Sequence, residues 1–135
     1  MASTKKTLKQ YAVISAGAMT GTTVLTSSIT VITGMDDVGY QFDWTGSPVG
    51  TFQIQVSANH NQDELGNQIT AGTWVPVTVT YWNGSSFITD TSIPTSVGSP
   101  VYVECTQFSA PYVRCVYTNA SSTGTLTVTV CGKSI

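Results

Sequence analysis

Charged residues are the scarcest feature of this chain of 135 residues, making up only 9% of it. There is one histidine, His60, and one arginine, Arg114. General acid–base and nucleophilic catalysis each need a poised pair of side chains, and the scattered acids, hydroxyls and thiols of this sequence do not suggest one. We therefore expect a structural or binding protein that has no enzymatic activity and no cofactor.

Cysteine is also sparse, with three residues at Cys105, Cys115 and Cys131. An odd, widely spaced set without a Cys-x-x-Cys or Cys-x-x-His pattern indicates neither a small-domain disulfide framework nor a zinc site. Cys115 and Cys131 could bridge only if the register of their strands placed them on the same side. We expect three reduced thiols that pack as small hydrophobes, and no metal site.

No apolar run reaches the length of a transmembrane span. The first twenty residues have the outline of a secretion signal, with a basic start and a small-residue stretch, but their apolar part is short and is broken by Ser15 and Gly17. We interpret residues 1–20 as an unprocessed N-terminal arm, either extended or forming a weak edge strand, and residues 21–135 as a single β-sandwich domain.

The arm is predicted to be ordered only against a neighbouring subunit, because its small residues bury too little surface to offset the entropy of ordering. Tyr11, Val13 and Ile14 would make that contact. Three of the five basic residues, Lys5, Lys6 and Lys9, lie in this segment, whereas all seven acids follow it. No aromatic residues interleave with these lysines, so nucleic acid is an unlikely partner.

Thr, Ser, Val and Gly are abundant, and a period-two alternation recurs along the chain, which is typical of β-strands with one apolar face. The turn clusters between the runs predict an all-β fold: an antiparallel β-sandwich, jelly-roll-like, with eight or nine short strands. Six residues on the apolar faces are expected to be largely buried: Phe42, Trp44, Phe52, Ile54, Leu126 and Val128.

Two antiparallel hairpins are predicted from paired runs. One spans residues 38–57, with a loop at residues 45–50, and the other spans residues 110–133, with a polar turn at residues 119–124. Both faces of the run at residues 112–118 carry large side chains, which indicates a central strand. Arg114 within it is expected to lie along the sheet with its head on a carboxylate or carbonyl.

The least regular segment, residues 58–72, is long for a loop in a compact β domain, and such loops are usually functional or mobile. Asn59, Asn61 and Asp63 have the spacing that opens a calcium loop, but the glycine and the closing acid are misplaced or absent. His60 has no second histidine or cysteine cluster nearby to suggest zinc. We interpret the segment as a polar surface loop, with these four residues as the candidate ligand set.

Tyr81 and Trp82 are adjacent and therefore lie on opposite faces of a strand, so that one ring must point outward or into an interface. Exposed aromatic rings can also stack on sugars. An alternative function is therefore a secreted or cell-surface adhesin or carbohydrate-binding module that binds a host-surface glycan, with four candidate residues: Trp44, Trp74, Tyr81 and Trp82.

Several short segments together resemble small β-sandwich structural proteins of bacterial viruses. They are residues 39–57, Trp74, residues 110–118, residues 123–128 and the closing Gly132-Lys133. The chain departs from that pattern in its N-terminal arm, in the loop of residues 58–72 and in its three cysteines. The resemblance implies a non-enzymatic virion protein (capsid, decoration or tail/fibre component) present in many copies, with other copies of itself and other virion proteins as partners.

Overall fold

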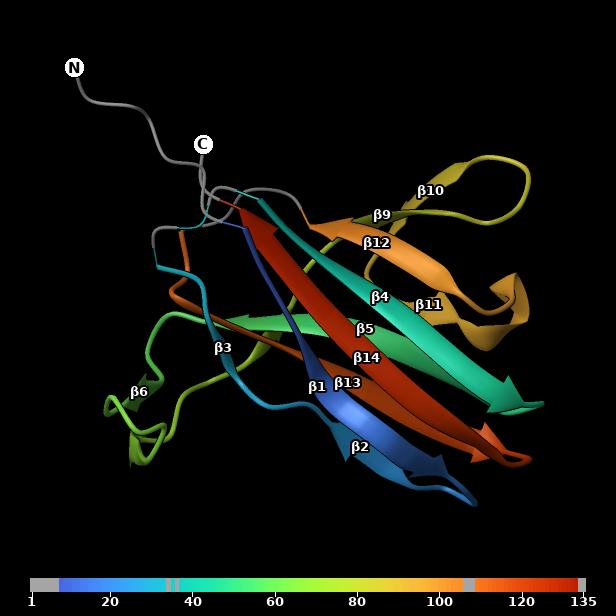
Figure 1. The fold of residues 1–135 in the computed structure, drawn as a ribbon, viewed down its shortest axis with the longest axis horizontal. Coiled ribbons are helices and arrows are strands. Elements are labelled where there is room, and N and C mark those ends of the chain that lie inside the picture. The colour runs from blue at the N-terminus through green and yellow to red at the C-terminus, as the bar shows by residue number, and fades with distance from the viewer. Residues whose placement is uncertain (1–7, 34, 36, 106–108, 134–135) are drawn as a thin grey trace.

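The computed structural model describes residues 8–33, 35, 37–105 and 109–133. Two antiparallel sheets, A and B, pack face to face, with a separate two-stranded hairpin at one side (Figure 1). The prediction of an all-β, antiparallel sandwich is confirmed.

Sheet A has six strands and forms the near layer in Figure 1. All of its neighbouring strands are antiparallel. From one edge to the other its order is β1 (Leu8–Met19), β14 (Gly124–Lys133), β4 (Asp37–Gly46), β12 (Val101–Cys105), β9 (Val79–Trp82) and β10 (Phe87–Asp90).

Sheet B is built on two long strands, β5 (Val49–Ser57) and β13 (Tyr112–Ser121), which pair along nearly their whole length. The short strands β11 (Ile93–Pro94) and β8 (Val75–Pro76) pair with β5, and β2 (Val24–Thr26) and β3 (Thr30–Val31) pair with β13. Strand β13 is central, as predicted. A 3-10 turn, η1 (Thr95–Val97), follows β11, and β6 (Asn61–Gln62) pairs with β7 (Gln68–Thr70).

The core lies between the two sheets and is centred on four aromatic rings. Phe52 of β5 contacts Phe42 and Trp44 of β4 and Tyr117 of β13, with ring centroids 4.4, 5.3 and 4.8 Å apart. Five of the six predicted core residues are fully buried: Phe42, Phe52, Ile54, Leu126 and Val128. Trp44 is half-buried at the end of its strand, packed against the same cluster.

The two hairpins predicted from the sequence are wrong. β4 belongs to sheet A and β5 to sheet B, and the consecutive strands β13 and β14 are divided in the same way. Each pair crosses from one sheet to the other, because the apolar faces of consecutive runs pack against each other across the core rather than side by side. The two crossings lie together, since the Ser47 N–H donates to the Thr123 carbonyl at 3.2 Å.

Gly46 allows this crossing. Its φ of +80° lies in the left-handed region, and a Cβ at this position would stand 2.4 Å from the Thr123 carbonyl oxygen. Only glycine tolerates both conditions. Asn83-Gly84, a turn signal in the sequence, does join a true hairpin, β9 to β10, in which the Asn83 N–H donates to the Ser86 carbonyl.

The N-terminal segment forms an edge strand of its own domain. The sequence analysis allowed either an extended arm or a weak edge strand, and the structure shows the strand. β1 pairs with β14 from Leu8 to Met19, and Val13 and Met19 are buried in the core. The expectation that this segment would be ordered only against a neighbouring subunit is therefore wrong for residues 8–19. Lys5 and Lys6 lie outside the described residues.

The described residues form fourteen strands, more than the eight or nine predicted. Most of the additional strands are two or three residues long: β2, β3, β6, β7, β8 and β11. Such short segments carry no periodic signal of their own. Strands β2, β3, β8 and β11 form because the long strands β5 and β13 offer them backbone partners, and β6 and β7 pair with each other.

Candidate functional site

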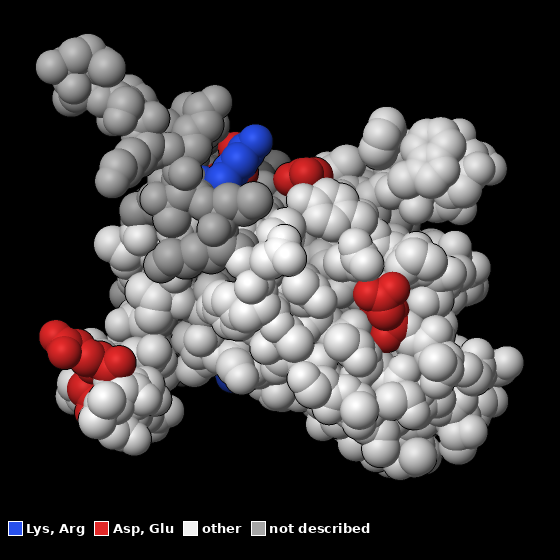
Figure 2. Space-filling model, viewed as in Figure 1, with Lys and Arg blue, Asp and Glu red and all other residues white. Residues whose placement is uncertain are grey.

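The outer face of sheet A carries three exposed aromatic side chains. Tyr102 on β12, Trp82 on β9 and Phe87 on β10 are 43%, 51% and 73% exposed. All three face outward, because their strand neighbours in the alternation, such as Val103 and Tyr81, face the core. This face carries few charged groups, and Figure 2 shows scattered acidic groups and a basic group near its upper edge.

Tyr102 lies across the sheet toward β4 and β14. Its hydroxyl is 3.8 Å from the Cys131 Sγ, and the Cys131 thiol in turn donates to the Gly39 carbonyl at 3.7 Å. A Cβ at Gly39 would stand 2.1 Å from the Tyr102 hydroxyl. The tyrosine side chain therefore occupies the space that any side chain at position 39 would need.

The hydroxyl of Tyr102 is held in its neutral form. Desolvation is the largest cause, and neighbouring Glu104 and Cys131 add to it, so that the pKa of Tyr102 is well above its ordinary value. A tyrosine with its ordinary pKa is already neutral at physiological pH, and the raised pKa keeps the Tyr102 ring uncharged further into the alkaline range.

A shallow hollow of about 310 Å³ adjoins Tyr102 on the same face. Two of its lining residues are glycines: Gly39 is buried under the Tyr102 side chain, and Gly132 is half-buried. Its charged groups are two carboxylates and one amine: Asp37, Glu104 and Lys133. The hollow thus combines an aromatic wall with both hydrogen-bond acceptors and a donor.

Trp82 and Phe87 form a second aromatic group, at the edge of the sheet. They are direct partners across the β9–β10 hairpin, and their rings pack edge to face with centroids 5.1 Å apart. This hairpin projects beside the rest of sheet A in Figure 1. The rings have no core to fill on this face, so they present apolar surface to solvent or to a partner.

The structure divides the predicted interface residues into two groups. Val13 and Tyr81 are buried in the core and Ile14 is half-buried against it, so these three serve the fold. Tyr11 and Trp82 are about half exposed. Tyr81 and Trp82 do lie on opposite faces of β9, as their adjacency predicts.

The four residues of the predicted ligand loop do not converge on one point. The Asn59 Oδ1 accepts hydrogen bonds from the Ser57 hydroxyl and the Thr73 N–H. Asp63 accepts from the N–H groups of Leu65 and Asn67, and hydrogen bonds from Asn67 lower the pKa of its carboxyl. Their oxygens close turns within the chain, and Asn61 is exposed on β6.

His60 is buried and belongs to an aromatic cluster on the outer face of sheet B. Its ring is 4.9 Å from that of Tyr112 and 5.5 Å from that of Trp74, and its Nε2 is 3.0 Å from the Gln62 Oε1. Arg114 stacks on Trp74 at 4.3 Å, and its Nε–H donates to the amide oxygen of Gln55. This cluster holds the segment between β5 and β8 against the sheet. The predicted contact of Arg114 with a carboxylate or carbonyl is made with the side-chain amide carbonyl of Gln55.

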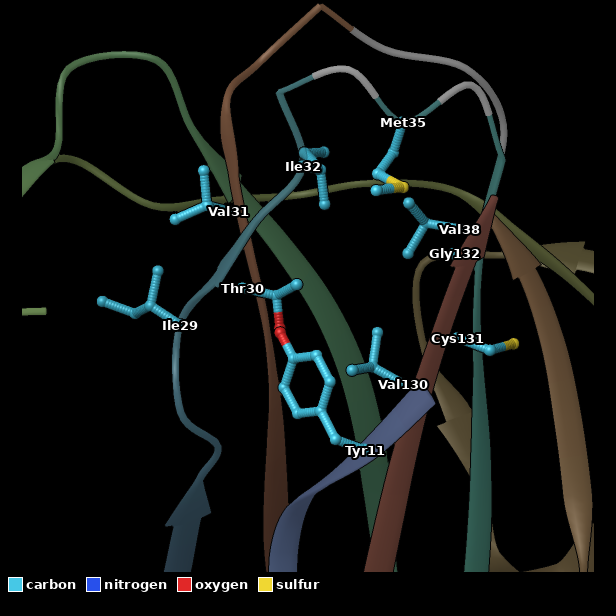
Figure 3. A pocket seen from close by; sticks show the side chains of 10 residues that line it. All are labelled: Tyr11, Ile29, Thr30, Val31, Ile32, Met35, Val38, Val130, Cys131 and Gly132. Atoms are coloured by element: carbon cyan, nitrogen blue, oxygen red, sulfur yellow. The ribbon is translucent and has the colours of Figure 1, made fainter. Parts of the chain in front are cut away.

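An apolar pocket of about 250 Å³ opens beside β1 (Figure 3). It lies where β1 and β14 of sheet A face the segment around β3. Its described lining residues are uncharged: Tyr11, Ile29, Thr30, Val31, Ile32, Met35, Val38, Val130, Cys131 and Gly132. It therefore has the character of a packing gap rather than of a site for chemistry.

Within the described part of the chain, no group of three or more His, Cys, Asp or Glu side chains could hold a metal ion. The same residues include no helix long and apolar enough to cross a membrane.

Neither a known family model nor a curated protein sequence matches this chain. A solved structure described as the crystal structure of the SPBc2 prophage-derived protein YomS superposes with a TM-score of 0.65 over 99% of both chains. The two proteins share one fold. Their sequences are 13% identical, so the likeness concerns the fold alone.

Sequence reasoning missed Tyr102, Glu104 and Gly39. The signal was present in the run Val101 to Cys105, where Val, Val and Cys alternate with Tyr and Glu. A tyrosine and a glutamate on the polar face of a strand point outward together. The role of Gly39 had no such signal, since only the pairing of β12 with β4 brings Tyr102 over it.

Proposed function

We propose that this chain is a non-enzymatic structural component of a bacteriophage particle, present in many copies that associate through their β-sheets. The observation that carries the proposal is the match in fold, over the whole length of both chains, with a prophage-derived protein. The resemblance of several short sequence segments to β-sandwich proteins of bacterial viruses agrees with this proposal.

The free edge of sheet A supports association between copies. β10 is the last strand in the order of that sheet, and its one charged residue, Asp90, stands at its end. Edge strands with unpaired backbone groups and few charges pair readily with other strands. The opposite edge is partly covered, since the Ser28 N–H donates to the Val13 carbonyl of β1.

The absence of catalysis is supported by the surroundings of His60. Its ring contacts Trp74, Tyr112 and the Gln62 amide, and none of these is an acid or a nucleophile. A general base needs a hydrogen-bonded orienting group and access to a substrate, whereas this ring is buried under a loop.

Sedimentation velocity on the purified chain tests the association. We expect oligomers that dissociate in Thr89→Lys, because a lysine on the edge strand β10 opposes strand addition. The matched control is Thr125→Lys, which places the same charge on an exposed position of the same sheet face, but on the inner strand β14. A strict monomer at high concentration, or equal effects of both variants, contradicts association through this edge.

Mass spectrometry of particles made by the phage or prophage that encodes this chain tests the role itself. We expect the chain in many copies per particle. Its absence from purified particles overturns the structural role, even if the isolated protein forms oligomers.

A further inference from the structure

We propose that the outer face of sheet A binds a neutral glycan, with a sugar ring stacked on Tyr102 above the adjoining hollow and the Trp82–Phe87 pair as a second contact. This is a binding function in addition to the proposed structural role, and it does not depend on that role. A particle protein with such a face would attach to a hydroxyl-rich polymer.

The ring of Tyr102 is already held in position for stacking on a sugar. The ring of Tyr102 lies over Gly39, and its hydroxyl is next to Cys131, so that its position is fixed on the sheet while 43% of the residue remains exposed. The face of an aromatic ring is electronegative, and the C–H bonds on the face of a pyranose ring are electropositive. A ring that is already held in place loses little entropy when a sugar stacks on it.

The polar groups beside Tyr102 suit sugar hydroxyls. The carboxylates of Asp37 and Glu104 accept hydrogen bonds, and the Lys133 amine donates them. A binding site typically joins a hydrophobic surface with a few convergent polar groups. The hollow of about 310 Å³ beside Tyr102 leaves space for a bound ring.

The charge of this hollow selects a neutral ligand. Its two carboxylates outnumber its one amine, so a nucleic acid or an acidic polysaccharide is repelled. An apolar protein segment would bury these three charged groups without satisfying them, which is costly. Sugar hydroxyls, in contrast, can donate to the two carboxylates and accept from the amine.

The register extends the face toward the edge of the sheet. Val103 pairs with Tyr81 and Glu104 with Thr80, so β9 lies directly beside β12, on the side away from Gly39. Adjacent strands are about 5 Å apart, so Trp82 and Phe87 stand one and two strands from Tyr102. A chain of several sugar units can therefore contact both aromatic groups.

A glycan array followed by calorimetric titration with chitotetraose, cellotetraose and maltotetraose tests the proposal. We expect at least one neutral glycan to bind, and Tyr102→Ala to weaken its affinity by tenfold or more. Tyr102→Phe, which keeps the ring, should remain within about threefold of the natural chain. Glu104→Gln should weaken binding if its carboxylate accepts hydroxyl hydrogen bonds.

Tyr11→Ala is the matched control. Tyr11 is 45% exposed, close to the 43% of Tyr102, but it lines the apolar pocket beside β1 rather than the outer hollow. Its replacement should leave glycan affinity unchanged. Circular dichroism on each variant separates lost binding from lost fold.

Three results overturn the proposal. The first is that no neutral glycan on the array, and none of the three tetrasaccharides at millimolar concentration, binds. The second is that binding is indifferent to Tyr102→Ala or prefers acidic glycans. The third is that Tyr102→Ala and Trp82→Ala dissociate oligomers in sedimentation velocity, since the face is then an interface between copies of this chain.

Discussion

Phe52 stands at the centre of the core, where three other aromatic rings contact it and no solvent reaches it. Phe52→Ala should lower the free energy of unfolding by about 3–5 kcal/mol, because it removes a fully buried ring and leaves a cavity. Urea denaturation monitored by circular dichroism measures the loss. Phe87→Ala is the control, and since Phe87 is 73% exposed the expected loss is below about 0.5 kcal/mol. Similar losses in both variants would mean that the core is not centred on Phe52.

The three thiols differ in burial and should differ in reactivity. Burial raises the pKa of Cys105 and the pKa of Cys115 to about 12 each. Only the thiolate attacks a disulfide reagent, and at pH 8 about one in ten thousand of such thiols is ionised. Cys131 is half-buried on the outer face.

Titration of the native chain with a disulfide reagent at pH 8 should therefore modify one thiol per chain quickly and the other two only after denaturant is added. Cys131→Ser is the control and should abolish the fast phase. Fast modification of all three thiols would contradict the burial of Cys105 and Cys115.

At the scale of elements, β1 is the strand whose role differs most from the sequence-based prediction. A chain that begins at Gly21 loses Met19 and Val13 from the core and leaves the edge of β14 unpaired. Replacing one buried methionine by alanine alone costs about 2–5 kcal/mol. We expect the shortened chain to melt more than about 10 °C lower or to aggregate.

Thermal unfolding followed by circular dichroism measures this effect. A chain that begins at Leu8 keeps the whole of β1 and serves as the comparison. Equal melting temperatures for the chain from Gly21 and the chain from Leu8 would mean that β1 does not stabilise the domain and that the segment is an arm.

At the scale of the whole molecule, buried ionisable groups make the fold sensitive to alkali. Burial raises the pKa of Tyr40 well above its ordinary value, and it raises the pKa of Cys105 and Cys115 from 9.0 to about 12. A group with a raised pKa in the folded state stabilises the fold fully below its unfolded pKa, and that contribution is lost as pH rises toward the folded value.

Stability should therefore be constant up to about pH 9 and fall between pH 9 and 12, by at most about 1.4 kcal/mol per pH unit for each thiol. Urea denaturation under reducing conditions at pH 8, 9, 10 and 11 measures this slope. Cys115→Ala should make the fall of stability with pH less steep. A stability that rises with pH in this range would contradict the raised pKa values of these buried groups.

The sequence by itself determined that the chain is all β and which side chains of the long strands β4, β5 and β14 face the core. Strict alternation around Phe42, Phe52 and Leu126 gave the correct face of each strand, because side-chain direction in a strand depends only on its local period of two. It also placed β13 at the centre of a sheet and the turn at Asn83-Gly84. Each of these is a local property of a few neighbouring residues.

Only the tertiary structure decided the partner of each strand. Whether two consecutive runs pair edge to edge or pack face to face depends on where the apolar faces of all the other strands lie, and so β4 and β5 separate into different sheets. The position of Tyr102 over Gly39 follows from that pairing, since the two residues are 63 positions apart and meet only where β12 lies beside β4. The candidate site could not be predicted from the sequence, because it is formed by neighbouring strands of one sheet face. The local period of a strand does not specify which strand lies next to it.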